Sequence, residues 1–97
     1  MKVEQFLNRN QFHIYGEDKD ILQSYDSKVV EISHERTPGN LLVKLGRDWD
    51  YSTTTSKHVY AFLEKYANVS FYNINNKRAY VQKLIDNNVF EYDEEMV

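Results

Sequence analysis

The first half of the chain alternates apolar and polar residues in the way that is typical of β-strands. Gln11–Tyr15 shows this alternation, and after a short polar turn a strand-like pattern returns over residues 21–32. Poor strand formers at Ser24–Ser27 predict a bulge or a break in the middle of that second segment. Pro38-Gly39 predicts a turn before a further strand over Leu41–Leu45. The pattern therefore indicates three strands in the first half.

The second half changes to helical spacing. One apolar face recurs at i, i+3, i+4 and i+7, in Val59, Phe62, Leu63 and Tyr66. Hydroxyl residues at Ser52–Thr55 precede that face and supply N-caps, because a hydroxyl oxygen accepts from an unpaired N–H of the first turn. Asn68 is a suitable stop for this helix. A second helix is expected over roughly Lys77–Asn87, with Asn75-Asn76 as its cap.

Strands followed by helices predict one α+β domain over residues 1–97. In this domain a small three-stranded antiparallel sheet is followed by two helices packed on one of its faces. Three shorter segments are less distinctive. Val3–Leu7 fits one helical turn, Val89–Tyr92 fits a short strand, and residues 69–74 fit either a strand or a packed connection.

Composition narrows the class of protein. The chain has no cysteine, which excludes disulfides and Cys-based zinc sites. Twelve Lys and Arg are scattered among fifteen Asp and Glu, for a net charge of −3, whereas binding to duplex nucleic acid needs several cations on one surface. No apolar run approaches the roughly 18 residues that cross a bilayer. The first residues also lack the apolar stretch of a signal peptide. A cytoplasmic location without membrane contact is therefore expected.

The candidate chemical groups form no recognisable catalytic pattern. His13, His34 and His58 lack metal-ligand spacing and are interpreted as lone surface histidines, so neither a metal nor a cofactor is expected. The GxSxG and P-loop motifs are missing from the sequence. Nothing in the spacing of serines, threonines and histidines indicates a catalytic triad. The sequence therefore predicts a protein that is not an enzyme.

The residues around Trp49, the only tryptophan, are interpreted structurally. If this segment were extended, Asp48 and Asp50 would share one face and Trp49 would occupy the other. We expect Trp49 to fill the core while the two acids face solvent or the start of the helix. The hydroxyl run with the nearby Lys57 is interpreted as helix capping rather than as a phosphate site.

Eight tyrosines are more than one small core can hold, so some are expected at the surface. Tyrosine is enriched at protein interfaces because it buries a large area and keeps a polar hydroxyl. The predicted partner-binding residues are Tyr25, Tyr51, Tyr60, Tyr72 and Tyr92, with Asp93, Glu94 and Glu95 as a phosphate-mimicking rim. The alternative is a small nucleic-acid-binding regulator that uses Lys57, Lys65, Lys77, Arg78 and Lys83. Exposed aromatic residues are also compatible with a homodimer.

Several short motifs agree with one family. They are Gln23–Ser27, Val30–Ile32, Trp49–Ser52, Thr54–Lys57 and Phe62-Leu63. Through them, residues 21–63 resemble a group of small proteins encoded by phages and mobile elements of Gram-positive bacteria. The resemblance carries over no catalytic residue. It implies an accessory protein that binds and modulates a host protein, for example an anti-CRISPR-like inhibitor of a nucleic-acid-handling defence enzyme.

Overall fold

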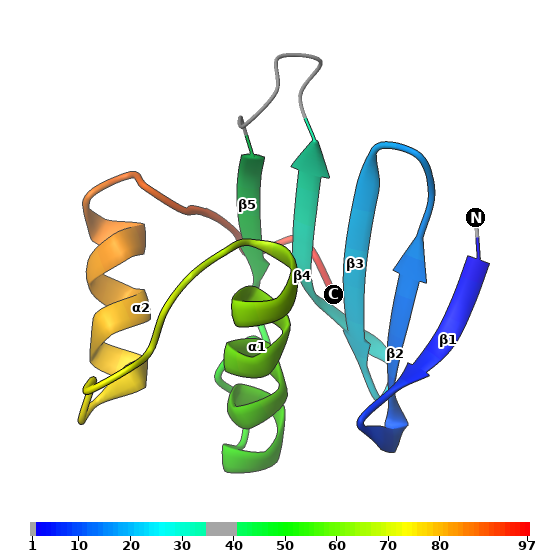
Figure 1. Cartoon of the computed structure of the whole chain (residues 1–97), viewed down its shortest axis with the longest axis horizontal. Helices are drawn as coiled ribbons and strands as arrows, with labels where there is room; N and C mark the ends of the chain where they lie inside the picture. The colour runs from blue at the N-terminus through cyan, green and yellow to red at the C-terminus, as the bar shows by residue number, and fades with distance from the viewer. Residues whose placement is uncertain (1, 35–40) are drawn as a thin grey trace.

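The strands form one sheet whose order follows the chain. The structure is a computed structural model that describes residues 2–34 and 41–97. Within that part of the chain, the sheet contains β1 (Lys2–Phe6), β2 (Asn8–Tyr15), β3 (Lys19–Ser24), β4 (Ser27–His34), β5 (Leu41–Gly46) and β6 (Glu91–Asp93). Neighbours from β1 to β5 are antiparallel, and β6 joins β5 in parallel (Figure 1). The predicted α+β class is confirmed.

The predicted number of three strands is wrong, because the described residues form six. β1 is an edge strand in which Lys2–Gln5 are exposed and only Phe6 is buried, so it lacks the apolar alternation that marks a half-buried strand. The helical turn predicted over Val3–Leu7 is therefore wrong. The short strand predicted near Val89–Tyr92 is present as β6, displaced by two residues at its start.

The break predicted at Ser24–Ser27 is a tight hairpin turn between β3 and β4. Ser24 pairs with Ser27, which leaves Tyr25 and Asp26 as the two turn residues. Tyr25 has a φ of 55°, a left-handed conformation that turns normally give to Gly, Asn or Asp. The turn predicted at Pro38-Gly39 lies outside the described residues.

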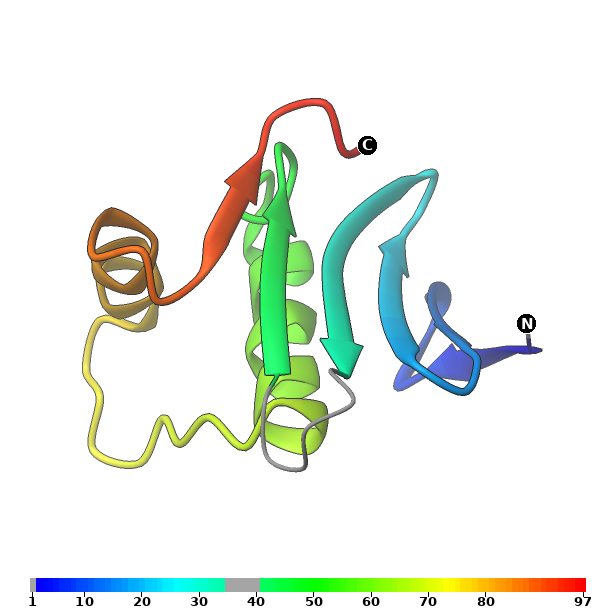
Figure 2. The same cartoon turned by 90° about the horizontal axis from the view of Figure 1, so that it is seen from above.

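Both helices begin and end close to the predicted positions. α1 (Thr53–Tyr66) has Ser52 as its N-cap, and the Ser52 side chain accepts from the Thr55 N–H at 3.1 Å. α2 (Lys77–Asp86) has Asn76 as its N-cap. Residues 69–74 contain no strand and connect the two helices. α1 packs against β3 and β4, and α2 lies beside it towards the β6 edge (Figures 1 and 2).

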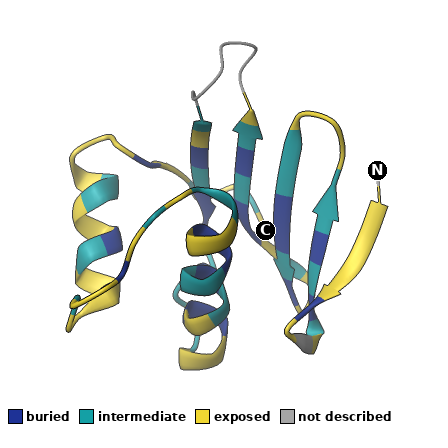
Figure 3. Cartoon of the chain, viewed as in Figure 1, coloured by how far each residue is buried: buried dark blue, intermediate teal, exposed yellow. Residues whose placement is uncertain are grey.

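The core fills the space between α1 and the sheet (Figure 3). Its fully buried members include Leu22, Ile32, Leu45, Val59, Phe62 and Leu63. Trp49 is 2% exposed and belongs to the same cluster, which confirms that it fills the core. Residues 47–50 form a turn rather than a strand, so the alternation of Asp48 and Asp50 against Trp49 that an extended segment would give does not apply.

Candidate functional site

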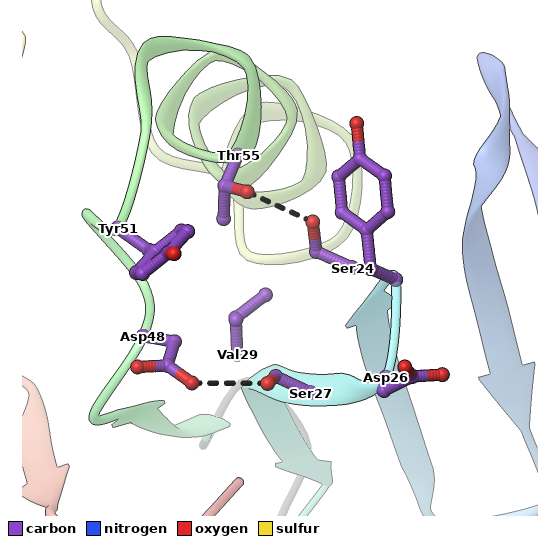
Figure 4. A pocket seen from close by; sticks show the side chains of 8 residues that line it. Ser24, Asp26, Ser27, Val29, Asp48, Tyr51 and Thr55 are labelled. Atoms are coloured by element: carbon purple, nitrogen blue, oxygen red, sulfur yellow. Dashed lines mark hydrogen bonds between the residues drawn. The ribbon is translucent and has the colours of Figure 1, made fainter.

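The β3–β4 hairpin and the turn before α1 border a half-open cavity of about 330 Å³. We call it the tyrosine cavity. Its lining residues are Ser24, Tyr25, Asp26, Ser27, Val29, Asp48, Tyr51 and Thr55. Ser24 and Asp26 belong to the hairpin wall, whereas Asp48 and Tyr51 form the facing wall (Figure 4). Val29 is fully buried and provides an apolar floor.

Two hydrogen bonds hold the walls together. The Ser24 and Thr55 hydroxyls lie 2.9 Å apart in the buried part of the site, 31 residues apart in sequence. The Ser27 hydroxyl donates to Oδ2 of Asp48 at 2.9 Å, across 21 residues (Figure 4). The Ser52 hydroxyl donates to Oγ1 of Thr55 at 3.2 Å, so the cap of α1 is connected to the cavity. These contacts set the distance between the walls.

Two tyrosines from different segments reach solvent at the cavity. Tyr25 is 51% exposed in the hairpin, and Tyr51 is 80% exposed in the turn before α1. The left-handed backbone of Tyr25 costs about 1–2 kcal/mol for a residue with a Cβ. The turn would be more stable with glycine or asparagine at this position, so Tyr25 lowers the stability of the local backbone.

A second depression, which we call the basic groove, lies on the other side of Tyr51. It is lined by Asp50, Tyr51, Ser52, Thr53, Ser56, Lys57, Tyr60, Lys77 and Arg78. The first turns of both helices contribute to it, and neither first turn carries an acidic residue. Arg78 forms an ion pair with Asp50 at 2.8 Å, and the Lys77 ammonium lies 6.0 Å from the ring centre of Tyr60. The groove is therefore cationic, with Asp50 offsetting part of that charge.

Tyr60 has a shifted titration. Burial raises the pKa of the Tyr60 phenol, and this effect exceeds the lowering of its pKa by the hydrogen bond to Ser56 and by the nearby Arg78 charge. Because the pKa is higher in the folded than in the unfolded chain, the fold stabilises the neutral phenol. The contribution of Tyr60 to the free energy of unfolding is complete below the pKa that it has in the unfolded chain. It is lost as the pH rises through the higher pKa of the folded chain.

The structure brings together only some of the predicted partner-binding residues. Tyr25 and Tyr51 share the tyrosine cavity, and Tyr51 shares the basic groove with Tyr60. Tyr72 is exposed in the connection between the helices and lines neither site. Tyr92 lies on β6, beside Leu45 of β5.

The acidic end lies apart from the cavity lining but close to the turn before α1. Asp93 is 4.0 Å from the Lys44 ammonium, and Glu94 and Glu95 are exposed. The Arg47 N–H donates to the Met96 carbonyl at 3.2 Å. This packing depends on Gly46, where an added Cβ would lie 2.6 Å from the Met96 carbonyl oxygen.

The expectation that all three histidines are lone surface residues is wrong for His13. His13 is 4% exposed, and its Nε2 lies 2.6 Å from Oδ1 of Asp20. His34 contacts the other Asp20 oxygen at 2.7 Å, while His58 bonds to the Thr54 carbonyl. None of the three lines the tyrosine cavity. Among the described residues, we find no group of three ligating side chains arranged to hold a metal ion.

Five polar lining residues escaped the sequence-based prediction of the site: Ser24, Asp26, Ser27, Asp48 and Thr55. Each had an adequate local explanation as a turn former, a surface acid or a helix cap. The available signal was that all five lie in or beside the motifs that carry the family resemblance. Because those motifs are far apart in sequence, only the tertiary structure shows that they meet.

Comparison with known proteins identifies one family. A model for a family of unknown function, DUF8033, matches residues 1–82. That range contains every residue that lines the tyrosine cavity and the basic groove, and it ends before β6. No curated protein and no solved structure matches the chain. In the described part of the chain, neither helix has the length and apolar character needed to span a membrane.

Proposed function

Because the chain belongs to DUF8033, a family of unknown function, we propose its activity from the site itself. We propose a non-enzymatic accessory protein of a phage or mobile element that binds and modulates a host protein in the host cytoplasm. The proposed class is an anti-defence, anti-CRISPR-like inhibitor. One observation carries the binding role: Tyr25 and Tyr51, from two motifs of the family resemblance, are exposed at one cavity.

The exposed tyrosines support a protein partner. Tyr and Trp dominate interface energetics because rigid aromatic rings bury area at a low entropic cost. Tyr51 leaves most of its ring surface in water, which is unfavourable unless another molecule covers it. The strained backbone at Tyr25 points the same way, because residues in costly conformations cluster at functional sites.

The hydrogen bonding of the cavity supports binding rather than catalysis. The hydroxyls of Ser24 and Thr55 are bonded to each other, and Ser27 is bonded to Asp48. An activated serine needs an adjacent base that a third group orients. The three imidazoles instead bond to Asp20 and to the backbone of α1. The cavity therefore resembles a recognition surface whose walls are held in place by hydrogen bonds.

Replacing Tyr25 with asparagine tests the binding role without damaging the fold. The affinity for a partner captured from a Gram-positive host lysate should fall by about 2 kcal/mol, roughly thirtyfold in Kd, as for a hot-spot residue. The free energy of unfolding should instead rise by about 1 kcal/mol, because asparagine tolerates the left-handed backbone. Titration calorimetry with the purified partner measures the first quantity, and denaturant unfolding measures the second.

Tyr72→Ala is the matched control, since it removes an exposed tyrosine outside the cavity and should leave the Kd unchanged. Equal losses of affinity in Tyr25→Asn and Tyr72→Ala would contradict a binding site centred on the cavity. Light scattering of the free protein checks whether the captured partner is a second copy of the chain.

A small nucleic-acid-binding regulator is the second candidate. It is favoured by the gathering of Lys57, Lys77 and Arg78 with two tyrosines in the basic groove. The other predicted cations do not join them: Lys65 lies over Phe6 and Tyr66, and Lys83, further along α2, does not line the groove. The Asp50 carboxylate also competes for Arg78. We therefore rank this candidate below a protein partner.

Binding of a fluorescent single-stranded oligonucleotide separates the two candidates. If the groove binds phosphates, anisotropy should show an affinity that falls steeply with salt. Lys77→Ala should weaken that affinity more than Lys83→Ala, because only Lys77 lines the groove. An oligonucleotide that leaves the anisotropy unchanged at low salt would rule out this candidate.

A further inference from the structure

We propose that the tyrosine cavity holds one cationic side chain, a lysine or an arginine, that projects from the partner protein. This inference rests on the proposed function, because it names the chemistry by which the same site recognises its partner. Three properties of the cavity lead to it: the sign of its charge, its aromatic walls and its size.

The charge of the lining is negative. Asp48 and Asp26 contribute carboxylates, and no Lys, Arg or His is among the described residues that line the cavity. One Asp48 oxygen accepts from Ser27, and among the described residues the other oxygen contacts only the exposed Arg47, whose Nε is 3.7 Å away. Asp26 lies at the rim, and its carboxylate is turned away from Asp48 (Figure 4). Asp48 is therefore the group placed to receive a cation.

The walls suit the rest of such a side chain. Tyr25 and Tyr51 come from different segments, and a cation over a tyrosine ring is attracted by the negative face of its π-system. The exposed rings of Tyr25 and Tyr51, rather than the fully buried Val29, can cover the aliphatic stem of a lysine or an arginine. The lining hydroxyl oxygens keep lone pairs that can accept from an ammonium or a guanidinium group.

The size of the cavity suits one long side chain. The volume of about 330 Å³ lies at the lower end of the range of roughly 300–1,000 Å³ for small-ligand pockets. A phosphate or a carboxylate would be repelled by the negative charge of Asp48. A purely apolar group would take water from Asp48 without replacing its hydrogen bonds, which is unfavourable. A cation is the ligand whose chemistry matches every wall.

The test is a two-dimensional amide NMR titration of the full chain with three single-residue probes. The probes are the N-acetyl methylamides of arginine, lysine and norleucine, the last having the four-carbon stem of lysine without its ammonium group. Saturable shifts confined to Ser24–Ser27, Asp48 and Tyr51 are expected with arginine, lysine or both, and should weaken with salt. Comparison of the two charged probes shows which side chain the cavity prefers. Norleucine should leave these signals in place.

Two variants sharpen the result. Asp48→Asn keeps an oxygen that accepts from Ser27 but removes the charge. It should therefore lower the affinity for the cationic probe about two- to fivefold, as for an exposed ion pair. Tyr25→Asn should lower the affinity for the cationic probe by a similar factor of about two to five, as for an exposed cation–π contact. Glu17→Gln, an exposed acid on the β2–β3 loop, is the control and should not alter binding.

Equal shifts with norleucine, or no shift at the cavity with any probe, would overturn the inference. Partner binding that depends on Tyr25 but not on Asp48 would also overturn it, while leaving the proposed function intact. Conversely, cationic probes that bind as expected support the inference even if a lysate yields no partner, in which case only the proposed function fails.

Discussion

Replacing Phe62 with alanine should lower the free energy of unfolding by about 3–5 kcal/mol. Phe62 is fully buried on the face of α1 that meets the sheet. Its ring contacts Phe6, His13 and Tyr66, with ring centres 5.3, 5.4 and 4.8 Å away. Truncation would leave a cavity between α1, β1 and β2, and these neighbours could close only part of it. Because small domains have about 5–15 kcal/mol of stability in total, about a fifth or more of it would be lost.

Denaturant unfolding followed by far-UV circular dichroism measures this loss. Tyr72→Ala is again a suitable control, since it truncates an exposed aromatic residue and should change stability by no more than about 0.5 kcal/mol. A decrease below about 1 kcal/mol for Phe62→Ala would show that α1 does not pack on the sheet through this ring.

Trp49→Ala should have an effect of similar size, about 3–5 kcal/mol, with a further consequence for the site. Trp49 is 2% exposed, and it anchors the turn that carries Asp48 and Tyr51. The backbone N–H of Trp49 donates to the Gly46 carbonyl, and the backbone N–H of Tyr51 donates to the Asp48 carbonyl. Without the indole ring, this turn would lose its attachment to the core. Stability and partner affinity should therefore fall together.

Thermal unfolding and calorimetric binding of the Trp49 variants, measured in parallel, test this link. Trp49→Phe retains most of the buried apolar area, so it should keep more of both properties than the alanine variant. Tyr25→Asn provides the contrast, since there affinity falls while stability rises. Full partner affinity in a folded Trp49→Ala variant would argue that the turn before α1 is not part of the binding surface.

The helices were predictable because their signals are local. The Ser52 and Asn76 caps lie within three residues of the N–H groups that they accept from. The apolar face of α1 recurs at helical spacing, and Val59, Phe62 and Leu63 are all buried. Strands β2 to β5 were found by their pattern of apolar residues, although the hairpin between β3 and β4 appeared only as a break. Its turn uses Tyr25 at a positive φ, so the usual glycine or asparagine signal is missing.

The pairing of the edge strands could not be predicted because it is not encoded in nearby residues. β1 contributes mainly backbone hydrogen bonds, and four of its five side chains are exposed. β6 is three residues long and pairs with a strand more than 40 residues earlier, Glu91 with Lys44. Such contacts depend on where the rest of the chain has placed the open edge of β5.

For the site, the sequence by itself identified Tyr25 and Tyr51 as surface tyrosines and Trp49 as a core residue. These assignments follow from composition and local pattern. Only the tertiary structure decided that the two tyrosines share a cavity, that Asp48 receives a hydrogen bond from Ser27, and that Thr55 faces Ser24. The physical reason is distance along the chain: caps and apolar faces form within a few residues, whereas these pairs meet only once α1 has packed on β3 and β4.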